Sequence, residues 1–454
     1  METHSAIANY QYKTALNDIA GNKFLKKKRN TLLYHLELGR LFHLNGNYTE
    51  SNRHFNYADD LMESYQSSLG DFAISVLANS NSKKYRAEPF EKILIHYYKA
   101  LNYSYLNLTE DALVEARRMN LKQMQLSEKS KKKYRNDPFG HLLMGQIYER
   151  AHDHNNAFIA YRNAVEAYNK EGSKLGVTIP NQLKIDLMRA AYLSKRTGDL
   201  IGYEKEFGRK YNHSQSEFGE VILYWENGQA PHKVEKQYIF TLVGGAGNFY
   251  FVDQENSMQV PFTGSINNPG DIASLTGLRV ALPDYRETPK YYGLENTISI
   301  NGEIQNQQLE SVENINRLAE KTLKERFVKD LTTHLTKLAI TKIAQMALQS
   351  DSTQEMQALG MIVGAAGFIS EKADTRNWQS LPSIINYARI PLTKKGTNMI
   401  ELTFVNHSNK KETIQLPIES NGSRLQIRNI FTPGKVPSGI ELGKIKTDTL
   451  TIKK

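Results

Sequence analysis

The chain has 454 residues, of which 40% are hydrophobic and 23% are charged. This composition is typical of a globular protein and excludes a disordered or membrane-embedded chain as a class. The formal net charge of +10 is a mild excess for this length and compels neither a nucleic-acid nor a membrane partner. Because the sequence contains no cysteine, disulfides, a thiolate nucleophile and thiolate-bound metal sites are excluded.

The first ten residues, METHSAIANY, show no charged segment followed by an apolar one, so they do not resemble a signal peptide. Two interpretations remain open at this point. Either the protein is cytoplasmic, or a leader has been removed.

A pattern of small and aromatic residues recurs along the first third of the chain. Its copies are Gly39, Phe42, Ser51, Phe55 and Ala58; Ala100, Tyr103, Ala112, Ala116 and Met119; and Gly145, Tyr148, Ala157, Tyr161 and Ala164. A fainter copy runs from Leu187 to Phe207. Small residues where two helices cross, with aromatic residues wedged between them, are typical of tetratricopeptide-type helix pairs. The spacing therefore predicts an α-solenoid domain over residues 1–213.

In such a solenoid the first helix of each pair lines a concave groove. The register places these residues in the groove: Leu36, Arg40, His43, Leu94, Tyr97, Leu101, Tyr105, Leu142, Gln146, Glu149 and Arg150. The members from the second copy are strongly apolar, so we expect something to cover them. A docked protein partner is one candidate. The chain's own N-terminal helix or its long helix is the other.

From residue 214 onward the spacing of the apolar residues changes, and residues 214–454 predict a mixed α+β domain. Short apolar or alternating runs predict strands at Val221–Trp225, Tyr238–Val243, Leu278–Leu282, Thr297–Ile300, Tyr387–Leu392, Met399–Val405, Glu412–Leu416, Leu425–Asn429 and Thr447–Ile452. Between them, an apolar stripe from Val312 to Leu338 steps by three or four residues and predicts a long helix over about 303–349. Such a helix should lie against the sheet, the solenoid or another copy of itself.

Signals for chemistry are weak. Gly244–Gly247 follow an apolar strand, but they lack the Lys-Ser/Thr of a phosphate-binding loop and are interpreted as a hairpin tip. No nucleophile elbow or zinc-protease motif is present, and the lysine runs lie in predicted loops without an aromatic platform for nucleic acid. Residues 358–370 are apolar but too short to span a bilayer as a helix, so close packing within the fold is favoured. We therefore expect no enzyme activity, no metal, no cofactor and no nucleic-acid binding.

Several segments resemble one family. They are ADTRNWQSLP (373–382), ARIPL (388–392), EPFE (88–91), ALVEARRMN (112–120) and ENGQAP (226–231). Taken in their order along the chain, they resemble a family of bacterial envelope lipoproteins that combine an N-terminal repeat domain with a C-terminal α+β region. The resemblance implies export to the cell envelope and lipid anchoring through an N-terminal cysteine, which this sequence lacks. It implies a location and an architecture, and no mechanism.

Within the first of these segments we expect a structural staple. Asp374 and Arg376 should form an ion pair that fixes the start of the next strand, and Trp378 should pack against the long helix. The favoured function is a non-enzymatic envelope scaffold or adaptor that holds a protein partner in the repeat groove. The alternative is an envelope enzyme or ligand-binding protein with its site in the C-terminal domain, near Gly244–Gly247 or Arg376.

Overall fold

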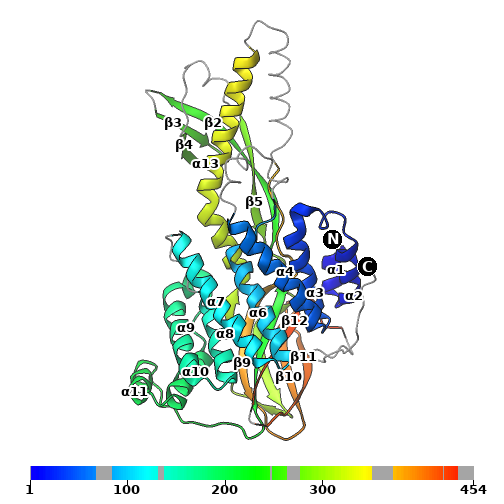
Figure 1. The fold of residues 1–454 in the computed structure, drawn as a ribbon, viewed down its shortest axis with the longest axis vertical. Coiled ribbons are helices and arrows are strands. Elements are labelled where there is room, and N and C mark those ends of the chain that lie inside the picture. The colour runs from blue at the N-terminus through cyan, green and yellow to red at the C-terminus, as the bar shows by residue number, and fades with distance from the viewer. Residues whose placement is uncertain are drawn as a thin grey trace.

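The computed structural model describes residues 2–67, 84–130, 137–245, 248–262, 277–349, 372–422 and 424–437. It is a mixed α+β structure in which helices form the N-terminal part and sheets the C-terminal part (Figure 1). The helical part ends at Glu206 and the first strand begins at Glu220, so residue 213 lies in the segment that connects them. The predicted strand Thr447–Ile452 and the apolar segment 358–370 lie outside the described residues.

Most N-terminal helices follow one another as antiparallel neighbours. They are α1 (Glu2–Ala8), α2 (Tyr12–Gly21), the short 3-10 helix η1 (Lys28–Asn30), α3 (Thr31–Leu44), α4 (Tyr48–Ser67), α6 (Pro89–Tyr105), α7 (Thr109–Ser130), α8 (Pro138–Arg150), α9 (His154–Leu175), α10 (Asn181–Leu193) and α11 (Thr197–Glu206). From α3 onward they pack in successive pairs, each helix against the next along the chain.

Local sequence sets where these helices begin. Helix α6 begins with a proline in its first turn and with a capping box. In this box the Glu88 side chain accepts a hydrogen bond from the backbone amide of Glu91, and the Glu91 side chain accepts one from the backbone amide of Glu88. Helix α8 begins in the same way at Pro138, where the Asp137 side chain accepts a hydrogen bond from the Phe139 amide at 3.0 Å.

The predicted small residues lie where paired helices touch. A Cβ placed on Gly39 would lie 2.6 Å from the ring of Phe55, and one placed on Gly145 would lie 2.4 Å from the ring of Tyr161. These distances are far below van der Waals contact. Glycine is therefore required at these two positions by the close approach of an aromatic ring from the second helix of the same pair.

Within the described residues, the strands form three sheets of four strands each. Their bounds are β1 (Glu220–Gln229), β2 (His232–Gly245), β3 (Asn248–Asp253), β4 (Met258–Pro261), β5 (Leu278–Arg286), β6 (Tyr292–Ile300), β7 (Glu303–Ile304), β8 (Glu310–Asn314), β9 (Pro382–Pro391), β10 (Thr397–Asn406), β11 (Lys411–Glu419) and β12 (Leu425–Thr432). We name them the central sheet (β12-β1-β9-β8), the outer sheet (β11-β10-β6-β7) and the lobe sheet (β4-β3-β2-β5). Strands β1 and β12 are parallel, and the other described pairs are antiparallel.

The central sheet lies between the helices and the outer sheet, and all ten residues of β1 are buried. On one face, Ile222 and Tyr224 join the hydrophobic core of the helices. On the other face, Val221, Leu223 and Trp225 join the core formed with the outer sheet. Because both faces of β1 are covered, its sequence shows a continuous apolar run instead of an alternation.

The lobe sheet packs on helix α13 (Ile315–Gln349), and the two together project from the body of the molecule (Figure 1). Alternate residues of β2, Tyr238, Phe240 and Leu242, face the helix and meet Leu331 and Leu335 there. The base of α13 lies against the helical part and β9. We expected the long helix to lie against the sheet, against the solenoid or against another copy of itself. One stretch of it thus lies on the lobe sheet, and another lies against the helical part.

The start of this helix differs from the prediction. The stretch predicted as helix from 303 includes strands β7 and β8, and α13 begins only at Ile315. Two local interactions explain the difference. Strand β8 is paired with β9, and the Asn314 side chain accepts from the amide of Arg317 at 3.1 Å, which caps the helix there. Among the described helices, none has a long enough apolar stretch to cross a membrane.

Replacing Gly145 by Ala tests the close helix approach. The added methyl group meets the fully buried ring of Tyr161, so the free energy of unfolding should fall by about 1–3 kcal/mol in urea denaturation. Gly202→Ala is the matched control, because Gly202 lies in helix α11 with open space around its Cα and alanine should stabilise it by about 0.5–1 kcal/mol. Equal stability of Gly145→Ala and wild type would contradict the packing described.

Candidate functional site

The residues predicted to line the groove face the central sheet of the same chain. Ten of them are buried: Leu36, Arg40, His43, Leu94, Tyr97, Leu101, Tyr105, Leu142, Gln146 and Glu149. Arg150 is partly buried. Strands β1, β9 and β12 cover these side chains. The prediction that the groove holds a protein partner is therefore wrong, and the chain's own sheet fills it in place of the N-terminal or long helix that we had considered.

An ion pair lies at the centre of this contact. Arg40 of α3 and Glu226 of β1 are in contact, and both side chains are completely buried. The Tyr97 hydroxyl donates to Glu226 Oε1 at 3.0 Å, and Asn429 of β12 donates to the same atom at 2.9 Å. Arg40 Nε donates to the carbonyl of Ser380 at 3.2 Å. A buried ion pair needs such additional hydrogen bonds to offset the loss of hydration.

The other polar groove residues also bind the sheet. His43 lies within hydrogen-bonding distance of Asn102 Oδ1 at 2.6 Å and of Asn429 Nδ2 at 3.1 Å. Burial, together with the charge of Arg40, lowers the pKa of His43 to about 3, so its ring is neutral at physiological pH. The Tyr105 hydroxyl donates to Asn429 Oδ1 at 2.9 Å. One asparagine of β12 thus joins two groove side chains, His43 and Tyr105, to Glu226 of β1.

The groove residues of α8 meet β1 and β9. Tyr224 of β1 donates a hydrogen bond to Gln146. Glu149 accepts from Arg389 Nη2 of β9 at 2.7 Å and from the Tyr161 hydroxyl at 2.7 Å. Arg150 donates to the carbonyl of Ser104 at 3.2 Å and so binds within the helical part.

The ion pair of the expected staple is present, but Trp378 packs against other helices than we expected. Arg376 and Asp374 form an ion pair at 2.5 Å, and Arg376 Nη1 also donates to Asn30 Oδ1 at 2.7 Å, which ties this segment to the helical part. Trp378 is buried, but its ring lies 5.8 Å from that of Phe55 and 6.0 Å from that of Tyr98. The tryptophan therefore packs on helices α4 and α6, and the prediction that it packs on the long helix is wrong.

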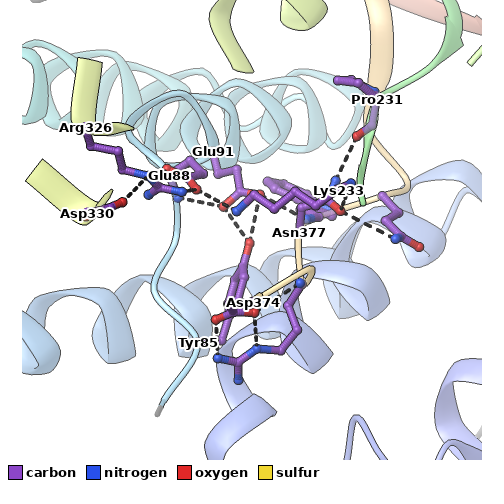
Figure 2. A network of polar contacts seen from close by, with 12 residues as sticks. Tyr85, Glu88, Glu91, Pro231, Lys233, Arg326, Asp330, Asp374 and Asn377 are labelled. Atoms are coloured by element: carbon purple, nitrogen blue, oxygen red, sulfur yellow. Dashed lines mark hydrogen bonds and ion pairs between the residues drawn. The ribbon is translucent and has the colours of Figure 1, made fainter. Parts of the chain in front are cut away.

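The staple belongs to a larger polar network (Figure 2), which we call the joint. The joint consists of Tyr85, Glu88, Glu91, Lys233, Arg326, Asp374, Arg376 and Asn377. Its centre is Glu88, the residue before α6. Lys233 of β2 donates to Glu88 at 2.7 Å, and Arg326 of α13 donates to the same carboxylate at 2.9 and 3.0 Å. Both elements that carry the projecting lobe, β2 and α13, are thus attached to one carboxylate at the start of helix α6.

A second carboxyl group, Glu91, lies beside Glu88 in the joint. The Tyr85 hydroxyl lies 2.8 and 2.7 Å from its two oxygens, and the backbone amide of Trp378 donates to it at 2.9 Å. Burial and the neighbouring Glu88 charge raise the pKa of Glu91 from 4.5 to about 7. The Tyr85 hydroxyl can donate a hydrogen bond to the ionised carboxylate or accept one from the neutral acid, so either protonation state of Glu91 has a partner.

The charged groups at the centre of the joint are buried and bind one another. Glu88, Glu91 and Lys233 are buried and engage one another, whereas a general acid must reach its substrate. Arg376 is buried and paired. Gly245 pairs with Asn248 at the end of the β2–β3 hairpin, in agreement with the hairpin interpretation of Gly244–Gly247. Within the described part of the chain, no cluster of three or more His, Cys, Asp or Glu could hold a metal ion.

Sequence reasoning missed most of the residues that make these networks, although a signal was present. Glu226 and Arg389 are charged residues within apolar strand runs, where an unpaired charge would be costly. Glu88 and Glu91 flank a proline–phenylalanine pair that opens a helix.

No protein-family model matches this chain, and no curated protein is similar enough to count as a relative.

The Glu91→Gln variant tests the raised pKa. Folding holds the proton on Glu91, so the unfolded chain loses it from about pH 4.5 upward while the folded chain keeps it until about pH 7. The free energy that protonated Glu91 contributes to folding is complete below about pH 4.5 and is lost as the pH rises through about 7. At about 1.4 kcal/mol per pKa unit, wild type should lose about 3 kcal/mol relative to Glu91→Gln over this interval in denaturant titrations.

Glu88→Gln is the contrasting control. Burial acts to raise the pKa of Glu88, but Lys233 and Arg326 outweigh it and the pKa is lowered. This variant should therefore be least stable relative to wild type at neutral pH, and the difference should shrink as the pH falls. A pH-independent difference for Glu91→Gln would contradict a neutral Glu91 in the folded protein.

Proposed function

We propose that the protein is a non-enzymatic scaffold of the bacterial cell envelope, in which a closed body presents the projecting lobe to a protein partner. The observation that carries this proposal is the lobe itself. Helix α13 and the lobe sheet extend away from the body, and the outward face of that sheet exposes apolar side chains. We therefore assign the partner surface to the lobe and not to the groove.

The repeat-type solenoid remains part of the proposal. Its support is the contact between each glycine and an aromatic ring of the paired helix, Gly39 with Phe55 and Gly145 with Tyr161. Successive pairing of the helices agrees with it. A tetratricopeptide-like array that is closed by its own sheet acts as a rigid base, and it no longer has a groove to offer.

The outward face of the lobe sheet has the chemistry of a protein contact. Ile239 and Val243 of β2 are 47% and 42% exposed, and Tyr250 of β3 is 37% exposed. Val243 and Tyr250 are opposite each other in the strand register, so their side chains adjoin on one face. Clustered exposed apolar groups are typical of interaction surfaces. A partner that covers them with apolar side chains would gain the free energy of their burial.

Pairing at the edges of this sheet is disfavoured. The edge strands are β4 and β5, and each contains a proline, Pro261 in β4 and Pro283 in β5. Proline has no amide hydrogen to donate to an added strand, and such residues protect edges from association. The face of the sheet, and not its edge, is therefore the surface that we assign to the partner.

The envelope location rests on the resemblance in segments 88–91, 226–231, 373–382 and 388–392. In the structure these segments supply Glu91, Glu226, Arg376 and Arg389, the buried charges that join the helices to the sheets. The resemblance thus covers the residues on which the architecture depends.

A photo-crosslinking residue in place of Tyr250 tests the proposal in cells of the native host. We expect one covalent adduct with another protein, identified by mass spectrometry, and we expect Val243→Glu to abolish it because a charge would be placed in the apolar contact. Tyr57 of α4 is the matched control, because it is a tyrosine that is 49% exposed on the body.

Three results would contradict the proposal. They are no adduct from position 250, an adduct that survives Val243→Glu, or the same adduct from position 57. Circular dichroism and the melting temperature of each variant should match wild type, because all of the altered positions are exposed.

A further inference from the structure

A polar cavity of about 450 Å³ lies where the helical part passes into the first strand. It is bounded by helix α10, by the segment that connects α11 to β1, and by the ends of β1 and β9. Small-molecule sites in proteins commonly have volumes of roughly 300–1,000 Å³. The cavity is therefore of a size that accepts a metabolite, and it is remote from the lobe.

Helix α10 directs one face toward this cavity. Gln182, Ile185 and Arg189 line it at helical spacing. The opposite wall is formed by the connecting segment and is rich in hydroxyl and amide groups, among them Tyr211, Asn212 and Ser214. Such groups are the hydrogen-bonding partners of a hydroxylated ligand.

Arg189 is a buried guanidinium with unused donors, since the residue is only 8% exposed. Among the described residues its hydrogen bonds go to Glu220 alone, at 3.0 and 2.8 Å, and both use Nη1. Its Nε is buried without a hydrogen-bond partner. Its Nη2 makes no hydrogen bond with a described residue, and a guanidinium N–H group of this kind donates a strong charge-assisted hydrogen bond to a carboxylate or phosphate.

Among the cations that line the cavity, Arg209 has no carboxylate partner in the described part of the chain. Arg389 pairs with Glu149, Asp186 and Glu220, at 2.7 to 2.8 Å, and Arg189 pairs with Glu220 at 2.8 Å. Lys210 at the mouth is paired with Glu204 at 2.7 Å. Arg209, also at the mouth, is exposed and forms no ion pair with a described residue. Its guanidinium therefore remains available to an anion.

We propose that this cavity binds a small hydroxylated organic anion, whose carboxylate or phosphate group pairs with Nη2 of Arg189 and with Arg209. The hydroxyl groups of the ligand bind the amide and hydroxyl side chains of the connecting segment. This binding is independent of the scaffold role, because no residue of the lobe sheet or the joint lines the cavity.

Isothermal titration calorimetry of the full chain at low ionic strength tests the proposal with glucuronate, glucose 6-phosphate and glucose. These probes share a hydroxylated ring and differ in the anionic group. We expect glucuronate or glucose 6-phosphate to bind with a Kd below about 1 mM, and glucose not to bind. The tighter of the two anions identifies whether the site prefers carboxylate or phosphate.

Arg209→Ala should weaken the bound anion by about tenfold, because one charge-assisted hydrogen bond is lost. Arg209 is exposed, so the variant should fold with an unchanged melting temperature. Arg53→Ala on α4 is the matched control, an exposed arginine far along the helices from α10, and it should bind as wild type does. No binding of either anion, equal binding of glucose, or equal affinity of Arg209→Ala and wild type would overturn the proposal.

Discussion

Arg40 and Glu226 meet where the concave face of the helices contacts the central sheet, and neither side chain is exposed to water. Removing two charges from water costs several kcal/mol per ion, so the pair persists only where other groups complete its hydrogen bonds. Tyr97 comes from a helix, whereas Asn429 and Ser380 come from the C-terminal part. Neither half of the chain can satisfy this pair alone.

The same dependence governs the apolar side chains around the pair. Leu36, Leu94 and Tyr97 are buried in one core with Ile222 and Tyr224 of the sheet. If the sheet were absent, these groove residues would form a large exposed apolar surface, which monomeric proteins rarely show. The helices and the central sheet are thus parts of one folding unit, although the spacing of apolar residues in the sequence changes between them.

Closure of the body also explains the role of the joint. Helix α13 has 35 residues, which corresponds to a length of about 50 Å, more than the body can cover. Arg326 near its base and Lys233 near the start of β2 both bind Glu88. Two attachments to one carboxylate fix the lobe at its base. The charge at Glu88 therefore determines how firmly the lobe is held.

Local features of this fold were predictable because they depend on nearby residues. The glycine–aromatic spacing located the helix crossings at Gly39 and Gly145, and apolar runs located β1, β9 and β10. Short strands such as β4 and β8 were missed, since two to five residues carry too little pattern. The occupant of the groove could not be predicted, because Leu94 and Tyr97 have the same sequence pattern whether a partner or a distant strand covers them. The partner of Trp378 likewise depends on tertiary packing.

Amide hydrogen exchange of the full chain in increasing urea tests most directly whether the sheet closes the helical part. If the two are one unit, amides of α3 and α6 and those of β1 and β12 should exchange through a single opening, with the same free energy and the same urea dependence. Exchange of β1 and β12 at much lower urea, while α3 and α6 stay protected, would show instead that the helices fold without the sheet and that their concave face can open to a partner.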